Sequence, residues 1–222
     1  MLRQDASGLA SEPASGAAVL DLRGPEAGPR APLPPWEPGD RVVVSGLPGS
    51  GKSTLMGRVA EPAGSGLVLV DSQEERERWE ARLPRWLPYA VYRPAVRTAH
   101  YARLWNALRS PAGVLVHDCG RNAFVRRWLA RDARRRRRGF HLLLLDVPPD
   151  AALAGQAARG RAVSRPAFGR HRRAVARLIA EVEAGALPPG CASATLLDRA
   201  SVSRLAPRWL ARPPSPASPE RG

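Results

Sequence analysis

The stretch Gly46-Leu47-Pro48-Gly49-Ser50-Gly51-Lys52-Ser53-Thr54 decides the fold, because it fits the pattern G-x-x-x-x-G-K-[ST] at every fixed position. The apolar run 42–44 precedes it and a helical stretch opens at 54–56, which is the strand–loop–helix context that the pattern requires. The glycines let successive backbone N–H groups point inward at phosphate oxygens, and the N-terminus of the following helix adds partial positive charge. We therefore predict a nucleotide-phosphate site at residues 46–54.

Within this loop, Lys52 is expected to reach the β- and γ-phosphates of ATP, and the Ser53 hydroxyl is expected to bind Mg²⁺. Lys52 also stands out by composition, because it is the only lysine among 35 basic residues. A compact ammonium suits a phosphate loop better than a planar guanidinium does. Scarce Lys, Ile and Asn, together with 23 Pro and 20 Gly, are typical of GC-rich coding, so the number of arginines alone says little about a nucleic-acid partner.

The composition excludes several classes of protein. A chain of 222 residues with 44% hydrophobic residues can form one domain with an ordinary core. Its two cysteines cannot form a disulfide framework, so a reduced cytoplasmic setting is expected. The first residues lead into no apolar region, and no apolar run approaches the roughly 20 residues of a membrane span. A membrane protein, a collagen-like chain and a disulfide-rich secreted module are therefore excluded.

The chain divides by composition into an arm, a folded domain and a tail. Residues 1–38 are rich in Ala, Gly, Pro and Ser and are predicted to be a disordered arm. Residues 212–222 are predicted to be a disordered tail. The domain between them, 39–211, has short apolar runs that predict strands at 41–45, 67–71, 114–118, 140–147 and 194–197. Helical stretches are predicted at 52–61, 73–81, 96–109, 122–138, 150–159 and 168–184.

This alternation of strands and helices predicts a three-layer α/β fold, with a mostly parallel five-stranded sheet covered by helices on both faces. Ligands of such sheets bind at the carboxyl ends of the strands. Asp118 ends the third predicted strand beside the loop, where an aspartate can hold Mg²⁺ together with Ser53. The alternative role of Asp118 is to cap a turn.

Two features weigh against motor ATPases and GTPases. The residue after Asp118 is Cys119, not the glutamate that many ATP-hydrolysing motors use to orient water. A chain whose only lysine lies in the loop has no N-K-x-D or T-K-x-D segment to read guanine. What remains resembles the small-molecule kinase branch of the P-loop NTPases over about residues 40–200, most of all the zeta-toxin-like or AAA-labelled ATP-binding proteins of high-GC bacteria.

The resemblance to zeta-toxin-like kinases implies a role for Asp71, at the end of the second predicted strand. In those kinases a carboxylate at this position accepts the proton of the substrate hydroxyl, which makes Asp71 the candidate base. The sequence Asp71-Ser72-Gln73-Glu74 also fits a helix N-cap with a capping box, and one residue can serve both roles.

A second resemblance follows the fourth strand, where Leu142–Asp150 and then Arg159-Gly160-Arg161 show the strand–Pro–helix–Arg order of nucleotide kinases, gluconate-kinase-like and zeta-toxin-like proteins. In those proteins an arginine-bearing lid closes over the triphosphate. The resemblance implies a lid at about 159–172, with Arg159, Arg161 and Arg165 stabilising the transferred phosphoryl group. For any single arginine, a solvated basic face is the alternative.

The predicted function is ATP binding and ATP-dependent phosphoryl transfer to a hydroxyl of an unidentified small acceptor, with ATP and Mg²⁺ as cofactors. An ATP hydrolase or switch without a small acceptor is the alternative. Another is a polynucleotide kinase or nucleic-acid-associated ATPase that uses segment 121–138, which has nine arginines and one acid. A solvated helix end is favoured for that segment, so a nucleic-acid partner is not the favoured interpretation.

Aromatic residues raise two further expectations. The segment between the second and third strands gathers Trp79, Trp86, Tyr89, Tyr92, His100, Tyr101 and Trp105. Since the resemblance places the acceptor there, these rings with Arg85, Arg93 and Arg97 predict a wall for a ring-bearing or anionic acceptor, although Leu104 and Trp105 also fit a plain core helix. In 121–138, the set Phe124, Val125, Trp128 and Leu129 predicts one helix stripe packed against the sheet.

Overall fold

A computed structural model describes residues 18–25, 31–61, 66–84, 86–118, 120, 122–158 and 164–206. Its strands are β1 (Ala18–Asp21), β2 (Ala31–Pro32), β3 (Arg41–Gly46), β4 (Leu67–Val70), β5 (Gly113–Asp118), β6 (Phe140–Leu145), β7 (Ser193–Leu197) and β8 (Leu205–Ala206). Its helices are α1 (Lys52–Ala60), α2 (Ser72–Glu80), α3 (Tyr89–Arg109), α4 (Ala123–Arg135), α5 (Pro149–Ala157), α6 (Arg165–Glu183) and α7 (Arg199–Arg204). No helix in these ranges combines the length and apolar character that a membrane span needs.

The main sheet has the strand order β1-β7-β6-β3-β5-β4, and every neighbouring pair is parallel. The five predicted strands are all present, so the mostly parallel α/β sheet is confirmed, but the predicted number is wrong because β1 adds a sixth strand. The central strands β3 and β5 are buried along their whole length. Their continuous apolar runs are what strands covered on both faces require.

The segment before the phosphate loop is partly folded. Strand β1 pairs with β7, and Arg23 forms ion pairs with Asp21, Asp146 and Glu183. Trp36 is only 1% exposed. The prediction of a disordered arm is therefore wrong for residues 18–25 and 31–38, because contacts with distant strands and helices order a segment whose own composition is that of a loop. Residues 1–17, 26–30 and the predicted tail 212–222 lie outside the described ranges.

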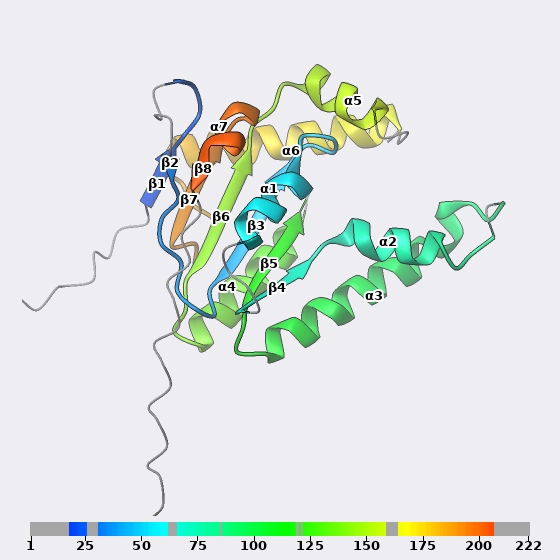
Figure 1. Cartoon of the computed structure of the whole chain (residues 1–222), viewed down its shortest axis with the longest axis horizontal. Coiled ribbons are helices and arrows are strands. Elements are labelled where there is room, and N and C mark those ends of the chain that lie inside the picture. The colour runs from blue at the N-terminus through cyan, green and yellow to red at the C-terminus, as the bar shows by residue number, and fades with distance from the viewer. Residues whose placement is uncertain are drawn as a thin grey trace, which may run out of the picture.

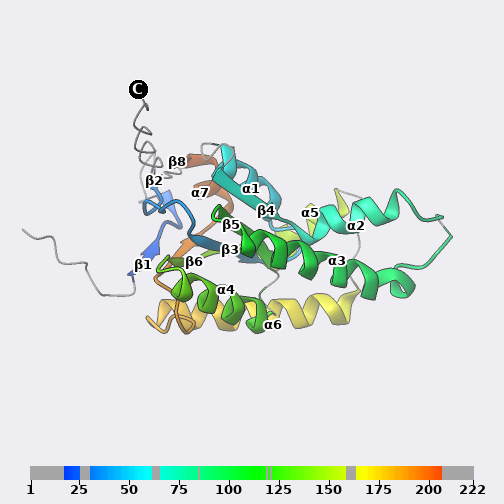
Figure 2. The same ribbon diagram turned by 90° about the horizontal axis from the view of Figure 1, so that it is seen from below.

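The helices form two layers around the sheet (Figures 1 and 2). Helices α1 and α7 lie on one face, and α4 and α6 lie on the opposite face (Figure 2). Helix α2 and the first half of α3 extend beyond the edge strand β4 as a projecting arm (Figure 1). Strand β4 leads directly into α2 at the base of this arm (Figure 1), so its carboxyl end carries Asp71 into the start of that helix.

Polar residues at the amino ends of the strands hold the fold together. The Arg41 side chain is fully buried and pairs with Asp132 of α4 at 2.8 Å. Asp40 accepts hydrogen bonds from the backbone N–H groups of Glu37 and Gly139, each at 2.7 Å. These groups pair with one another at the end of the sheet that lies opposite the phosphate loop, so they serve stability, although Nη2 of Arg41 has no hydrogen-bond partner among the described residues.

Candidate functional site

The loop 46–51 packs tightly against helix α5. Gly49 has φ +84°, and a Cβ there would lie 2.1 Å from the carbonyl oxygen of Ala152, so only glycine fits. The Nε2 group of Gln156 donates to the carbonyl of Pro48 at 3.1 Å, which fixes the outer side of the loop. The loop is therefore held in one conformation by backbone packing.

Lys52 begins helix α1, and its side chain lies over the loop. Its Nζ donates to the carbonyls of Gly46 at 2.9 Å and Leu47 at 2.6 Å, and the residue is 4% exposed. The buried hydroxyl of Ser50 has no hydrogen-bond partner among the described residues. An ammonium, an unpartnered hydroxyl and a helix N-terminus thus meet at one place, which is a combination that suits phosphate oxygens.

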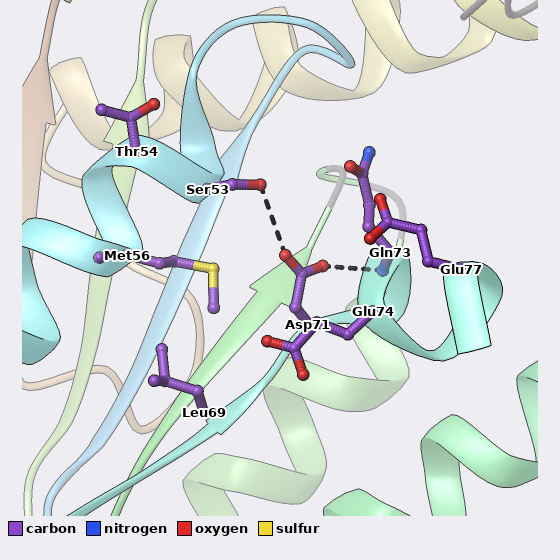
Figure 3. A pocket seen from close by; sticks show the side chains of 9 residues that line it. Ser53, Thr54, Met56, Leu69, Asp71, Gln73, Glu74 and Glu77 are labelled. Carbon is purple, nitrogen blue, oxygen red and sulfur yellow. Dashed lines mark hydrogen bonds between the residues drawn. The ribbon is translucent and has the colours of Figure 1, made fainter. Parts of the chain in front are cut away.

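Asp71 lies between this loop and helix α2. Its Oδ1 accepts from the backbone N–H of Gln73 at 2.8 Å, which confirms the predicted N-cap. Its Oδ2 accepts from the Ser53 hydroxyl at 3.4 Å, so one carboxylate joins α2 to the first turn of α1 (Figure 3). Burial raises the pKa of Asp71, and the charge of Glu74 adds to this, while the hydrogen bonds from Gln73 and Ser53 oppose it.

His117 is a neighbour of Asp71 that the sequence analysis did not single out. Its Nδ1 lies 3.3 Å from Oδ1 of Asp71 and 3.1 Å from the hydroxyl of Ser72. Burial lowers the pKa of His117 well below its ordinary value, so the imidazole that lies beside Asp71 is neutral. A single histidine inside an otherwise apolar strand, directly before a predicted functional aspartate, is the signal that could have identified it.

Asp118 ends strand β5 beside Ser45 of β3, as predicted. Its Oδ2 accepts from Nη1 of Arg126 at 2.8 Å, while its buried Oδ1 has no hydrogen-bond partner among the described residues. A buried carboxylate oxygen with no partner is costly unless a cation or water completes it. Asp118 and the Ser53 hydroxyl therefore fit Mg²⁺, a cation that prefers oxygen ligands and keeps several waters.

The described residues contain no cluster of three or more His, Cys, Asp or Glu side chains that could hold a metal by themselves. In nucleotide sites Mg²⁺ is usually bound by substrate phosphates, waters and one or two protein oxygens. Asp118 and Ser53 would therefore bind Mg²⁺ together with the phosphates of a nucleotide and not by themselves.

Two cavities flank the first turn of α1. The first has a volume of about 480 Å³ and lies between α1 and α2 (Figure 3). It is lined by Ser53, Thr54, Met56, Gly57, Leu69, Asp71, Gln73, Glu74 and Glu77. The second has a volume of about 380 Å³ and lies toward α5 and α7. It is lined by Ser50, Gly51, Thr54, Arg58, Leu145, Gly155, Ala158, Arg199, Val202 and Ser203.

The predicted lid is not tested by these contacts. Arg159 and Arg161 lie outside the described residues, and Arg165 is exposed in the first turn of α6, where it forms no hydrogen bond or ion pair with a described residue. The expected aromatic and arginine wall does not line the first cavity. Tyr89 instead packs edge-on against Tyr92 with ring centroids 5.3 Å apart, and Arg76 of α2 covers the Tyr89 ring. These rings join α2 to α3.

Comparison with known proteins agrees with this architecture. A family model described as "AAA domain" matches residues 42–184, which is more than half of the chain. No curated protein matches the sequence. Among solved structures, one of the PezAT chromosomal toxin–antitoxin system of Streptococcus pneumoniae has a TM-score of 0.54 at 14% identity, covering 72% of this chain and 68% of that one.

A candidate kinase from Chloroflexus aurantiacus has a TM-score of 0.50 at 17% identity, covering 72% of this chain and 85% of that one. Shikimate kinase from Acinetobacter baumannii, in complex with shikimate, has a TM-score of 0.48 at 18% identity, covering 74% and 87%. At such identities a structural likeness bears on the fold alone. The family match and the phosphate loop together lead to one conclusion: the chain belongs to the AAA domain family and has the fold of a kinase-type P-loop NTPase.

Proposed function

We propose that this protein is an ATP-dependent phosphotransferase that acts on a hydroxyl group of a small molecule. The observation that carries the proposal is the position of Asp71. Its carboxylate contacts Ser53 of the phosphate loop and also lines the 480 Å³ cavity between α1 and α2. A carboxylate that borders both a nucleotide loop and an open cavity is in the place where a base for an acceptor hydroxyl is needed.

The nucleotide is proposed to bind with its phosphates on the loop and its base in the second cavity. Leu145, Gly155 and Val202 supply apolar and backbone surface in that cavity, and this suits the flat face of a nucleobase. Lys52 would neutralise the β- and γ-phosphates. Ser53 and Asp118 would hold Mg²⁺, which when bound supplies positive charge to the phosphate oxygens.

In the proposed transfer, the acceptor hydroxyl oxygen forms a bond to the γ-phosphorus. The bond from that phosphorus to the bridging oxygen of ADP breaks, and the hydroxyl proton passes to Asp71. A raised pKa makes Asp71 a stronger base than an exposed aspartate, because its carboxylate binds a proton more tightly. The neutral His117 would fix the orientation of the carboxylate through Oδ1 and leave Oδ2 turned toward Ser53.

The cavity favours some acceptors over others. Asp71, Glu74 and Glu77 give it three carboxylates, and no arginine or lysine is among its lining residues. Coulomb repulsion in a partly dehydrated site disfavours carboxylate or phosphate groups near these side chains. We therefore expect a neutral or amine-bearing hydroxyl compound. The proposed lid arginines Arg159, Arg161 and Arg165 would act on the phosphoryl group and would not reverse this preference at the acceptor.

The experiment is a transfer screen with γ-labelled ATP and Mg²⁺ across nucleosides, neutral sugars, amino sugars, sugar acids and 5′-hydroxyl oligonucleotides. Label should appear on a neutral or amine-bearing acceptor and should be lost in Lys52→Ala, which should also fail to bind ATP by calorimetry. If Lys52→Ala retains ATP affinity, the nucleotide site is wrong. If the label appears only as inorganic phosphate with every acceptor, the protein is an ATP hydrolase instead.

A further inference from the structure

Helices α3 and α4 lie side by side (Figure 2), and aromatic rings of the two helices contact one another. Trp105 of α3 stacks at an angle against Trp128 of α4, with ring centroids 5.9 Å apart and planes 31° apart. Phe124 lies against the same Trp128 ring at 6.1 Å. Trp105 is 54% exposed and Phe124 is 61% exposed. Contiguous exposed aromatic surface of this kind is uncommon on a protein without a partner at that site.

This arrangement corrects two expectations from the sequence. The stripe that α4 buries consists of Val125, Leu129 and two alanines, and Trp128 packs against the same core while partly buried, but Phe124 is exposed. Likewise Leu104 is fully buried whereas its neighbour Trp105 points outward. Adjacent helical residues differ in direction by about 100°, so one member of each pair must leave the core.

Arginines frame the rings. On α4, Phe124, Arg127, Trp128, Arg131 and Arg135 recur at i, i+3, i+4, i+7 and i+11, which places them on one helix face. All three of these arginines are exposed, and no carboxylate among the described residues forms an ion pair with them. The single acid of α4, Asp132, is occupied by Arg41 and Arg136. We call Trp105, Phe124, Trp128, Arg127, Arg131 and Arg135 the aromatic–arginine surface.

We propose that the aromatic–arginine surface binds single-stranded nucleic acid, with bases stacked on the exposed rings and phosphates paired with the arginines. Single-strand binding sites combine stacking platforms with a basic track along the backbone, and this surface supplies both on one pair of helices. An intact duplex hides the faces of its bases, so it could use only the arginines. The arrangement of the arginines, not their number, favours this partner, and binding at this surface is independent of the proposed phosphotransfer.

Charge disfavours the other occupants. A second copy would bring its own positive stripe against this one. The segment 207–222, which lies outside the described ranges, contains three arginines and one glutamate and is therefore also of the wrong sign. A polyanion is the partner that complements a surface with unpaired guanidinium groups around aromatic rings.

The test measures binding of the full chain to a fluorescein-labelled single-stranded 20-mer of dT by fluorescence anisotropy. The matched probe is a 20-mer of the same length with abasic sites, which keeps the phosphates and removes the bases. The expected result is at least tenfold tighter binding to the dT 20-mer than to the abasic strand. Trp105→Ala/Phe124→Ala should weaken dT binding about tenfold or more while leaving abasic binding unchanged, because only strands with bases can stack on the rings.

Arg127→Gln/Arg131→Gln should weaken binding to both strands. It should also reduce the slope of log affinity against log salt concentration by the amount expected for about two phosphate contacts. The control is Arg93→Gln/Arg97→Gln, which removes the same charge from exposed positions nearer the start of α3 and should change affinity less than twofold. All three variants change exposed side chains, so thermal unfolding should match that of the parent chain.

Equal affinity for the dT and abasic strands, or unchanged dT binding in Trp105→Ala/Phe124→Ala, would overturn the proposal. So would the absence of binding at low salt. If light scattering shows a dimer that the aromatic variant converts to a monomer, the occupant is a second copy and the proposal is again overturned. If a duplex 20-mer binds as tightly as the single strand, the surface recognises charge alone and the proposal is overturned.

Discussion

Nη1 of Arg126 lies 2.8 Å from Oδ2 of Asp118, and both side chains are almost completely enclosed. The second oxygen of the carboxylate has no partner among the described residues. The strand-end aspartate of the nucleotide site is therefore held from one side only, by the helix that carries the aromatic–arginine surface. This leaves its free oxygen for the magnesium ion that the proposed function requires.

Replacing Arg126 by Ala should destabilise the protein by about 3–5 kcal/mol, because it leaves the Asp118 charge buried without a partner. Urea denaturation measures the change. Saturating Mg²⁺ should raise the melting temperature of this variant more than that of the parent chain, since the cation can replace the lost guanidinium. The double variant Arg126→Ala/Asp118→Asn should recover part of the loss and lose the response to Mg²⁺. A cost below about 1 kcal/mol for Arg126→Ala would contradict the enclosed ion pair.

Asp71→Asn should abolish phosphoryl transfer without lowering stability. Asn caps a helix about as well as Asp does, so the contact with the Gln73 N–H survives. The raised pKa means that the folded state favours protonated Asp71, so its charge costs stability above that pKa and the cost disappears as the pH falls. Asn removes this cost at neutral pH, and the melting temperature should be unchanged or higher.

Asp71→Ala is the matched comparison, since it removes both the base and the cap and should lose about 1 kcal/mol. Calorimetry at pH 7.5 and a labelled-ATP assay would measure the two properties. Transfer that persists in Asp71→Asn would show that Asp71 is a helix cap only.

The rate of transfer should fall at acid pH as Asp71 becomes protonated, and the midpoint should move in a defined direction in Glu74→Gln. Burial is the main cause of the raised pKa, and the Glu74 charge adds to it. Removing that charge lowers the pKa of Asp71, so the acid limb of kcat should shift to lower pH. Glu80→Gln is the control, because Glu80 lies on the same helix but pairs with Arg76 and does not line the cavity. If the acid limbs of kcat coincide in the parent chain and in Glu74→Gln, the Glu74 charge does not influence the pKa of Asp71.

The fold was largely predictable because its determinants are local. The glycine loop, the apolar strands and their alternation with helices identified the sheet and the ends of strands where Lys52, Ser53, Asp71 and Asp118 lie. The partners of these groups were not predictable. Arg126 is one of nine arginines in a short segment, and nothing in its sequence neighbours distinguishes the one that reaches Asp118.

The same limit explains the outward rings. Hydrophobic character predicted burial for Trp105 and Phe124, but the side of a helix that meets the sheet depends on how α3 and α4 pack against it. The strand β1 was missed for a related reason. It has only four residues, lies at the sheet edge and is mostly exposed, and its three apolar residues stand inside a stretch whose composition is that of a loop.

The chain should not tolerate removal of residues 18–38, although it should tolerate removal of residues 1–17. The segment 18–38 contributes an edge strand to β7 and three buried side chains, Leu22, Leu33 and Trp36. Losing a buried Leu or Trp costs about 2–5 kcal/mol each, and the sum approaches the whole stability of a typical domain. A chain beginning at residue 39 should therefore show no cooperative thermal transition by circular dichroism, whereas one beginning at residue 18 should unfold within a few degrees of the full chain.

Trp36→Ala in the full chain should lose about 3–5 kcal/mol and would separate the effect of the core from that of the strand. A cooperative transition at the parent temperature in the chain that begins at residue 39 would mean that the segment is a dispensable arm after all.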